Sequence, residues 1–271
     1  CRAGSVRRSG ARAACVVVAV ALGLLLEGLL AGANVLEHLR GTLVGRSDLG
    51  RDHHLGGRAV LPGWVDSHTH MVFDGDRSAE FEARISGGSY EAGGIAVTMD
   101  ATRQAGTDRL DKLVADRVAA GRRGGTTTFE TKTGYGLNTE SEVEAAKVAS
   151  RHVDDVTFLG AHLVPPGADA EDYLDEVVGP MLEGVAPYVQ WIDVFCERGA
   201  FNEEQSRRVL EAGKKLGLGL RVHGNQLGEG PGVALAVELG AASVDHVNHL
   251  SDEDVELLAN SDTVATMLPA C

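Results

Sequence analysis

From Arg58 onward, short apolar runs rich in β-branched and aromatic residues alternate with longer stretches in which apolar residues recur every three or four positions. Short apolar runs bounded by turn residues predict buried strands, and the longer period predicts amphipathic helices. Seven runs are predicted to be strands: Ala59–Val65, Thr126–Glu130, Val156–Leu159, Trp191–Phe195, Leu218–Val222, Ser243–His246 and Val264–Leu268.

The stretches between these runs carry helix signals. One helical face is predicted for Leu110, Leu113, Val114 and Val118. Two pairs have the spacing of a capping box, Thr139 with Glu142 and Asn202 with Gln205, and Ser251 precedes a further helix. The Gly-rich, polar stretch from Phe73 to Gly106 is predicted to be a long loop that follows the first strand.

Seven strand–helix units in succession predict a parallel sheet, and a single domain of this length favours a (β/α)8 barrel. The eighth strand of such a barrel is absent, and the apolar run Val264–Leu268 lies almost at the last residue. The sequence therefore predicts a truncated barrel over residues 57–271, which is a fragment of a longer protein.

Residues 1–56 do not follow the strand–helix pattern and form an atypical N-terminal segment. Residues 13–33 are strongly apolar and follow three arginines, so a signal peptide or membrane anchor is one interpretation. Glu27 interrupts the stretch, and the uninterrupted run is short for a membrane span. A mistranslated or divergent segment is the alternative, and no membrane association is expected.

Composition restricts the compartment and the partners. The chain has 271 residues and a formal net charge of −14, which argues against non-specific nucleic-acid binding. The four cysteines, Cys1, Cys15, Cys196 and Cys271, have neither metal-site nor disulfide-framework spacing. A reduced, cytoplasmic location is expected.

The candidate chemistry begins at the end of the first predicted strand. His68 and His70 are separated by one residue in the sequence DSHTH. If the strand continues through them, both side chains point to one face, where two imidazoles could bind the same divalent ion. A solvated loop is the simpler alternative for a His-x-His pair alone.

Other polar residues follow the remaining strands. Active sites of (β/α)8 barrels lie at the carboxyl ends of the strands, so these residues should meet at one rim. The residues at this rim are Glu130, Lys132 and Tyr135, then His162, Cys196, Glu197, His223, Gln226, Asp245 and His246. Lys132 is predicted to be a surface or supporting charge, and Cys196 a buried small thiol.

Seven motifs resemble the imidazolonepropionase family of the amidohydrolase superfamily. They are LPGWVDSHTHMVFDGDR, TTTFETKTGYGL, TFLGAHLVPP, DVFCERGAF, HGNQLG, GAASVDH and TVATMLP, and they occur in order between residues 57 and 270. The resemblance implies hydrolysis of the ring amide of 4-imidazolone-5-propanoate to N-formimino-L-glutamate, in histidine degradation. It does not extend over residues 1–56.

The resemblance also implies roles for individual residues. One divalent ion, Zn or Fe, would be bound by His68, His70 and His223, together with an Asp that has no counterpart in this chain. His246, with an ordinary histidine pKa, would move the proton of the attacking water, with Asp245 beside it for orientation. Gln226 is a further catalytic candidate, and a homodimer is expected.

Residues that match the family's substrate contacts are Arg77, Tyr135, His162 and Gln226. The small-molecule substrate carries a carboxylate, for which the planar guanidinium of Arg77 is a suitable partner. A surface ion pair of Arg77 with Asp74, Asp76 or Glu80 is the simpler alternative.

Three other functions remain open at this point. A different cyclic amidase or a deaminase of the same superfamily would share the metal residues. An inactive fragment with an incomplete metal site is the second alternative, because an open barrel exposes two strand edges. A membrane-tethered form depends only on residues 13–33.

Overall fold

The computed structural model describes residues 61–76 and 94–268 of the chain. The apolar stretch 13–33, the first two residues of the predicted strand Ala59–Val65, and Arg77 lie outside these residues. From Gly63 onward the chain forms one compact unit, and the description below concerns this unit.

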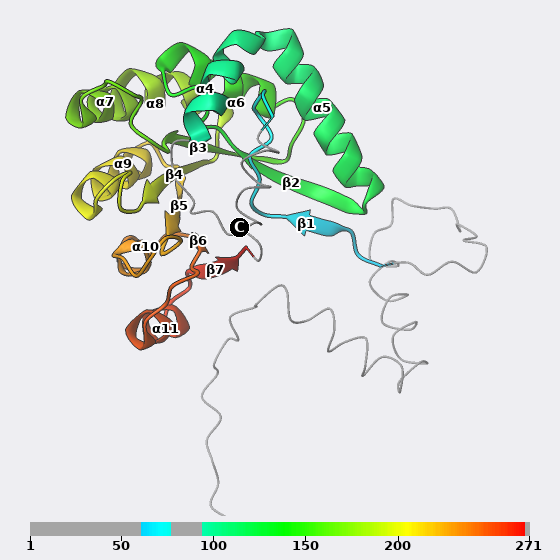
Figure 1. Ribbon diagram of the computed structural model, residues 1–271. Helices are drawn as coiled ribbons and strands as arrows, with labels where there is room; N and C mark the ends of the chain where they lie inside the picture. Colours follow the sequence, from blue (N-terminus) through cyan, green and yellow to red (C-terminus); the bar gives the residue numbers. More distant parts are fainter. Residues whose placement is uncertain (1–60, 77–93, 269–271) are drawn as a thin grey trace, which may run out of the picture. The chain divides into compact units, whose positions relative to one another are not determined.

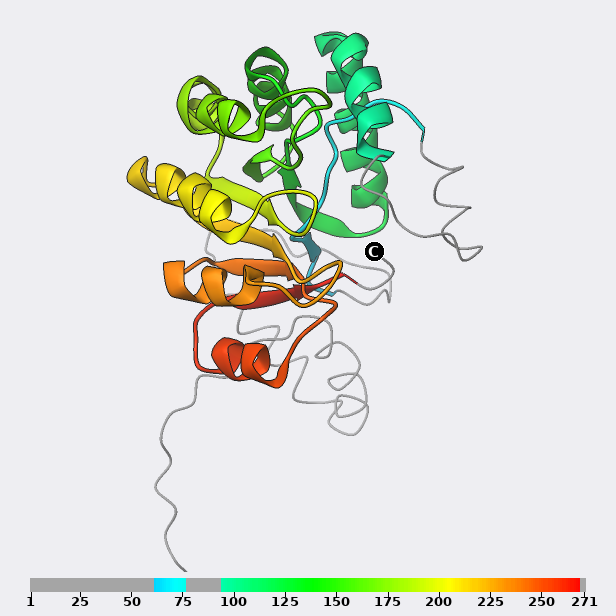
Figure 2. The same cartoon turned by 60° about the vertical axis from the view of Figure 1, so that its left-hand side comes forward.

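Seven parallel strands form one sheet in the order of the sequence, from β1 to β7. Their bounds are β1 Trp64–Asp66, β2 Thr126–Lys132, β3 Asp155–Ala161, β4 Trp191–Cys196, β5 Gly219–Gly224, β6 Ser243–His246 and β7 Val264–Met267. The sheet curls, and the helices lie along its outer side (Figures 1 and 2). This is an incomplete (β/α)8 barrel, as the strand pattern predicted.

The helices follow the strands in alternation and cover the sheet. Their bounds are α4 Gly94–Ala105, α5 Thr107–Arg123, α6 Thr139–Ala149, α7 Ala170–Glu176, α8 Leu182–Val185, α9 Glu203–Lys215, α10 Gly232–Leu239 and α11 Asp252–Ala259. A π-helical segment, η1 Val177–Met181, and a 3₁₀ turn, η2 Ala186–Tyr188, lie either side of α8. The predicted long loop Phe73–Gly106 is wrong in part, because α4 occupies its last third.

Burial changes from the centre of the sheet to its two outer strands. Side chains of β3 to β6 are nearly all buried. By contrast, Trp64 and Val65 of β1 are 56% and 61% exposed, and Val264 and Met267 of β7 are 45% and 47% exposed. Within the described residues no strand pairs with the outer edge of β1 or β7. Apolar surface therefore remains exposed at both ends of the open sheet.

The amphipathic pattern of α5 is reproduced in its packing. Leu110, Val114 and Val118 are buried in the core that lies between the helices and the sheet, whereas Leu113 is only partly buried. Burying these aliphatic side chains stabilises the packed helix by roughly 1.5–3 kcal/mol each. α5 therefore packs against β2 through the face that the sequence predicted.

The helix caps confirm most of the predicted starts. Asn202 and Gln205 form the predicted capping box of α9, and Ser251 caps α11 together with Asp254. The predicted box at Thr139 and Glu142 is wrong, because Asn138 caps α6 by accepting a hydrogen bond from the backbone N–H of Ser141. Glu142 instead accepts hydrogen bonds from backbone N–H groups of the loop that precedes α6.

No helix in the described ranges is both long and apolar enough to span a bilayer.

Candidate metal centre

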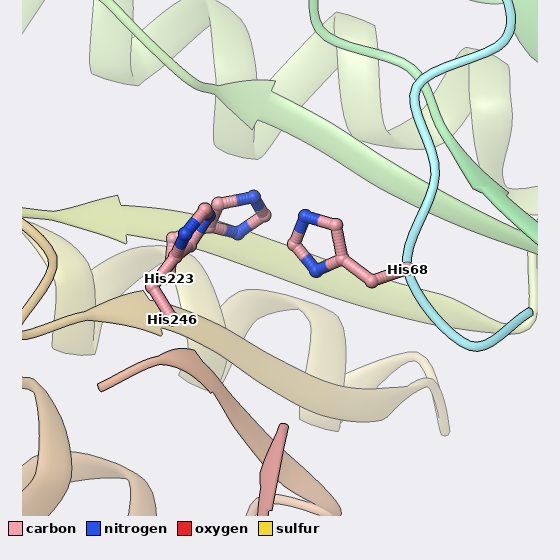
Figure 3. A group of neighbouring side chains, drawn as sticks. All are labelled: His68, His223 and His246. Carbon is pink, nitrogen blue, oxygen red and sulfur yellow. The ribbon is translucent and has the colours of Figure 1, made fainter. Parts of the chain in front are cut away.

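Four histidines meet at the carboxyl ends of the strands. His68 and His70 follow β1, His223 lies near the end of β5, and His246 ends β6. Figure 3 shows His68, His223 and His246 with their rings directed toward one another. The ring centroid of His68 lies 4.7 Å from that of His223 and 5.1 Å from that of His246. One nitrogen from each of these three residues lies within 4.8 Å of the others, as a shared ion would require.

His70 joins this cluster through His223. The two Nε2 atoms are 3.4 Å apart. Two nitrogens that bind one tetrahedral zinc at its usual bond length are separated by roughly 3.3 Å. His68 and His70 have ring centroids 5.3 Å apart. His70 therefore lies next to His68 and His223, but the three histidines whose nitrogens all lie within 4.8 Å of one another are His68, His223 and His246, so the predicted ligand set His68, His70 and His223 stays a prediction.

Carboxylates on the far side of two rings favour the tautomer that a metal needs. Nδ1 of His68 lies 2.7 Å from Oδ2 of Asp245 in a hydrogen bond, and Nδ1 of His223 lies 2.9 Å from Oδ2 of Asp193. A carboxylate beside Nδ1 favours a proton on that atom and leaves the lone pair on Nε2. Ligand imidazoles in metalloproteins are commonly oriented in this way.

Burial keeps the central imidazoles neutral. Removal from water, followed by the nearby histidines, holds the pKa of both His70 and His223 well below the ordinary value. A neutral imidazole has a free lone pair, which is the form that binds a metal. The donor set therefore fits a divalent ion of the zinc or iron type.

Lys132 is completely buried, so of the two predicted alternatives the surface charge is wrong and the supporting charge remains. Its Nζ is 3.0 Å from Glu130, 3.2 Å from Asp193 and 3.5 Å from Asp245. Burial opposes the ammonium form, but these three carboxylates outweigh it and raise the pKa of Lys132. The barrel interior thus has a charged layer where aliphatic side chains are usual.

The two aspartates of this layer respond differently to burial. Desolvation raises the pKa of Asp193. Desolvation also acts on Asp245, but Lys132 and the hydrogen bond from His68 together hold the pKa of Asp245 well below its usual range. Asp245 therefore accepts from His68 as a carboxylate. The prediction that Asp245 orients its neighbour His246 is wrong, because its hydrogen-bond partner is His68.

His246 has an unusual backbone and an unusual environment. Its φ of 78° and the φ of 45° at Val247 are in the left-handed region, which non-glycine residues rarely adopt. This turn follows β6 at the point where the ring reaches the cluster. Burial, with His68 as the next cause, lowers the pKa of His246 to about 4, so the expected ordinary pKa is wrong.

Tyr135 and His162 lie beside His70. The ring centroid of Tyr135 is 5.7 Å from that of His70 and 5.4 Å from that of His162. The rings of His70 and His162 are stacked with centroids 5.5 Å apart. Nδ1 of His162 is 2.8 Å from the carbonyl oxygen of Gly134. Two of the predicted substrate contacts are therefore adjacent to the imidazole cluster.

The loop that carries Tyr135 is fixed by two charged side chains. Glu142, which is fully buried, accepts hydrogen bonds from the backbone N–H groups of Gly134, Gly136 and Leu137 at 2.7–2.9 Å. Arg103 of α4 donates to the carbonyl oxygens of Gly136 and Leu137. Backbone groups on both sides of Tyr135 thus have partners, which holds the loop in place.

Gln226 lies on the turn that follows β5. Glu197, which follows β4, accepts from the backbone N–H of Gln226 at 2.5 Å and from that of Leu227 at 3.1 Å. Cys196 beside it is buried and unpaired, as predicted. Arg77 lies outside the described residues, so its predicted contact remains a prediction. Asp74, one alternative partner of Arg77, is paired with Arg109.

Asp193 is the residue of this centre that sequence reasoning missed. It lies in the middle of the apolar run WIDVF, is completely buried and lies beside both Lys132 and His223. The available signal was a carboxylate at an inward-facing position of an otherwise apolar strand. Such a group requires a buried partner.

Comparison with solved structures supports the fold alone. The chain aligns with a 5-methylcytosine deaminase from Klebsiella pneumoniae with a TM-score of 0.57 and 14% identity, covering 79% of this chain and 57% of that one. It aligns with a guanine deaminase from C. acetobutylicum with a TM-score of 0.53 and 12% identity, covering 77% and 54% of the two chains.

Comparison with curated proteins gives much higher identity. No protein-family model matches the chain. It is 64% identical over 228 residues to the imidazolonepropionase of Paenarthrobacter aurescens, covering 79% of this chain and 56% of that protein. It is 65% identical over 226 residues to that of Arthrobacter sp., covering 80% and 56%. The chain spans about half the length of these relatives. It is related to the imidazolonepropionases over that part of their length, in agreement with the sequence motifs.

Proposed function

We propose that the protein to which this chain belongs hydrolyses the ring amide of 4-imidazolone-5-propanoate to N-formimino-L-glutamate in histidine degradation. The observation that carries this proposal is the identity of 64–65% to imidazolonepropionases over 79–80% of the chain. The imidazole cluster at the rim supports it, because hydrolysis of an unactivated amide needs a strong nucleophile at neutral pH.

His68, His70 and His223 would bind one divalent ion, zinc or iron. Support comes from the 3.4 Å separation of the His70 and His223 Nε2 atoms and from the carboxylates behind His68 and His223. When bound, such an ion supplies a Lewis acid that lowers the pKa of water and polarises the amide carbonyl. The residues of this chain hold, orient and surround that position.

His246 would move the proton between the attacking water and the leaving ring nitrogen. Its ring centroid lies 5.1–5.2 Å from those of His68 and His223, so it reaches the same space from β6. Gln226 is a further candidate for this step, supported by its position on the β5 turn that Glu197 fixes.

The substrate would be held by Arg77, Tyr135, His162 and Gln226. Tyr135 and His162 support this proposal because both rings lie beside His70. The propanoate needs a cationic partner on a chain of net charge −14, and Arg77 is our candidate. We also propose a homodimer in the cytoplasm. Cys196, the one cysteine within the described residues, is unpaired, as a reducing compartment allows.

The direct test is turnover with purified full-length protein. Loss of 4-imidazolone-5-propanoate should be accompanied by one equivalent of N-formimino-L-glutamate, measured by mass spectrometry, and a chelator should abolish it. Guanine and 5-methylcytosine serve as alternative substrates, because the aligned structures are deaminases. Ammonia released from either base, without activity on the imidazolone, would replace the proposal with a deaminase.

A further inference from the structure

Lys132 lies between two aspartates, Asp193 and Asp245, and each aspartate lies beside a histidine of the cluster. Its fully buried ammonium lies 3.2 Å from Oδ2 of Asp193 and 3.5 Å from Oδ2 of Asp245. These two aspartates come from β4 and β6, either side of β5. One cation therefore sits between two carboxylates that belong to different strands.

Each of these carboxylates has a histidine on its other side. Oδ2 of Asp245 accepts from Nδ1 of His68 at 2.7 Å, and Oδ2 of Asp193 lies 2.9 Å from Nδ1 of His223. In both aspartates the same oxygen faces Lys132 and the histidine. Asp245 is hydrogen-bonded to its histidine, whereas Asp193 only lies close to Nδ1 of His223 without a hydrogen bond. The ammonium therefore lies beside the carboxylate next to each imidazole.

We propose that Lys132 is a positioning residue that holds Asp193 and Asp245 in place and thereby orients His68 and His223 toward a shared divalent ion. This inference rests on the proposed metal site, and it adds a residue that neither the motifs nor the comparisons assign to it. Asp193 and Asp245 each place an oxygen within 4.8 Å of a His223 nitrogen and of each other. Like charges at that separation repel when nothing lies between them. Without the ammonium the two carboxylates would separate and the imidazoles would turn with them.

A substitution at Glu130 makes it possible to test the positioning role of Lys132 without changing the net charge. It is the third carboxylate beside Lys132, at 3.0 Å, but its other partners are Thr157 and the backbone of Thr69 rather than a histidine. Lys132→Met removes one positive charge, and adding Glu130→Gln removes one negative charge. The double variant has the net charge of the parent but lacks the ammonium between the two aspartates.

The test compares zinc affinity and folding in four full-length proteins: the parent, Lys132→Met, the double variant, and Lys112→Met as a control. Lys112 is 75% exposed and pairs with Asp116. The zinc dissociation constant is measured by competition with a chromogenic chelator, without substrate, and thermal unfolding is followed on the metal-free proteins. Loss of a group that supports metal ligands typically weakens binding by about 10- to 100-fold.

We expect the double variant to unfold near the parent temperature and to bind zinc about 10- to 100-fold more weakly, whereas Lys112→Met binds normally. A double variant with parental zinc affinity would overturn the proposal. Failure of both Lys132 variants to fold would also overturn it, since Lys132 would then serve the fold alone. A parent that binds no zinc would instead contradict the proposed metal site. If the parent binds zinc normally but does not hydrolyse 4-imidazolone-5-propanoate in the turnover assay, only the proposed substrate is contradicted.

Discussion

Oδ2 of Asp245 lies 2.7 Å from Nδ1 of His68, although the two residues are 177 positions apart in the sequence. The contact joins the last residues of β6 to the segment that follows β1. It links the first histidine of the His-x-His pair to the charged layer beneath it. The orientation of His68 therefore depends on a residue from the opposite part of the sheet.

Replacing the Asp245 carboxylate should weaken metal binding more than it destabilises the fold. Asp245→Asn keeps the shape of the side chain but loses the charge that favours a proton on Nδ1 of His68. We expect zinc affinity to fall by about 10- to 100-fold. Isothermal titration with zinc measures this, with Asp262→Asn, an exposed site, as the control. Equal affinities in the two variants would refute a supporting role for Asp245.

His246→Asn should separate proton transfer from metal binding. We expect metal content near that of the parent and a loss of roughly 10²- to 10⁴-fold in kcat. The matched control is His249→Asn, because His249 is exposed on the turn that follows β6 and its backbone bonds to Asn225. Parental turnover in His246→Asn across the pH range would show that another group moves the proton.

Arg77 is predicted to bind the propanoate of the substrate. Arg77→Lys keeps the charge but loses the bidentate fork, and Arg77→Ala loses both, so kcat/KM should fall in both variants and further in Ala. Metal content should not change. Arg109→Ala is the control, since Arg109 is exposed and pairs with Asp74. An Arg77→Ala protein with parental kcat/KM would contradict the predicted contact between Arg77 and the propanoate.

Glu142→Gln should loosen the loop that carries Tyr135. The amide keeps one acceptor oxygen but presents an NH₂ group to backbone N–H donors that now face a carboxylate. We expect a loss of about 1–3 kcal/mol in the free energy of unfolding and a higher KM. Chemical denaturation and steady-state kinetics measure the two effects. Glu140→Gln, at an exposed position of the same helix, should change neither, and equal behaviour of both variants would contradict this account.

The strands and the rim were predictable because both follow from local rules. Runs such as Trp191–Phe195 are buried on both faces, and parallel strands bring their carboxyl ends to one edge. His68, His70, His223 and His246 could therefore be assigned to one rim from their positions alone. The start of α6 was missed by one residue, because Asn138 and Thr139 are both good capping residues and sequence spacing does not choose between them.

The charged layer was not predictable in the same way. Lys132 looks like an ordinary strand-end lysine until carboxylates from β4 and β6 are placed around it. Asp193 interrupts an apolar strand, which shows that it needs a partner but not which partner. Contacts between strands that are not neighbours depend on the curvature of the sheet, and sequence periodicity contains no information about curvature.

The central claim is that one divalent ion is bound by His68, His70 and His223. Elemental analysis of the purified full-length parent, His223→Ala and His152→Ala tests it most directly, because His152 lies outside the cluster and should not matter. The account predicts one zinc or iron per chain in the parent and in His152→Ala, and little or none in His223→Ala. Full metal occupancy in His223→Ala, or a parent that binds none when zinc or iron is supplied, would contradict it.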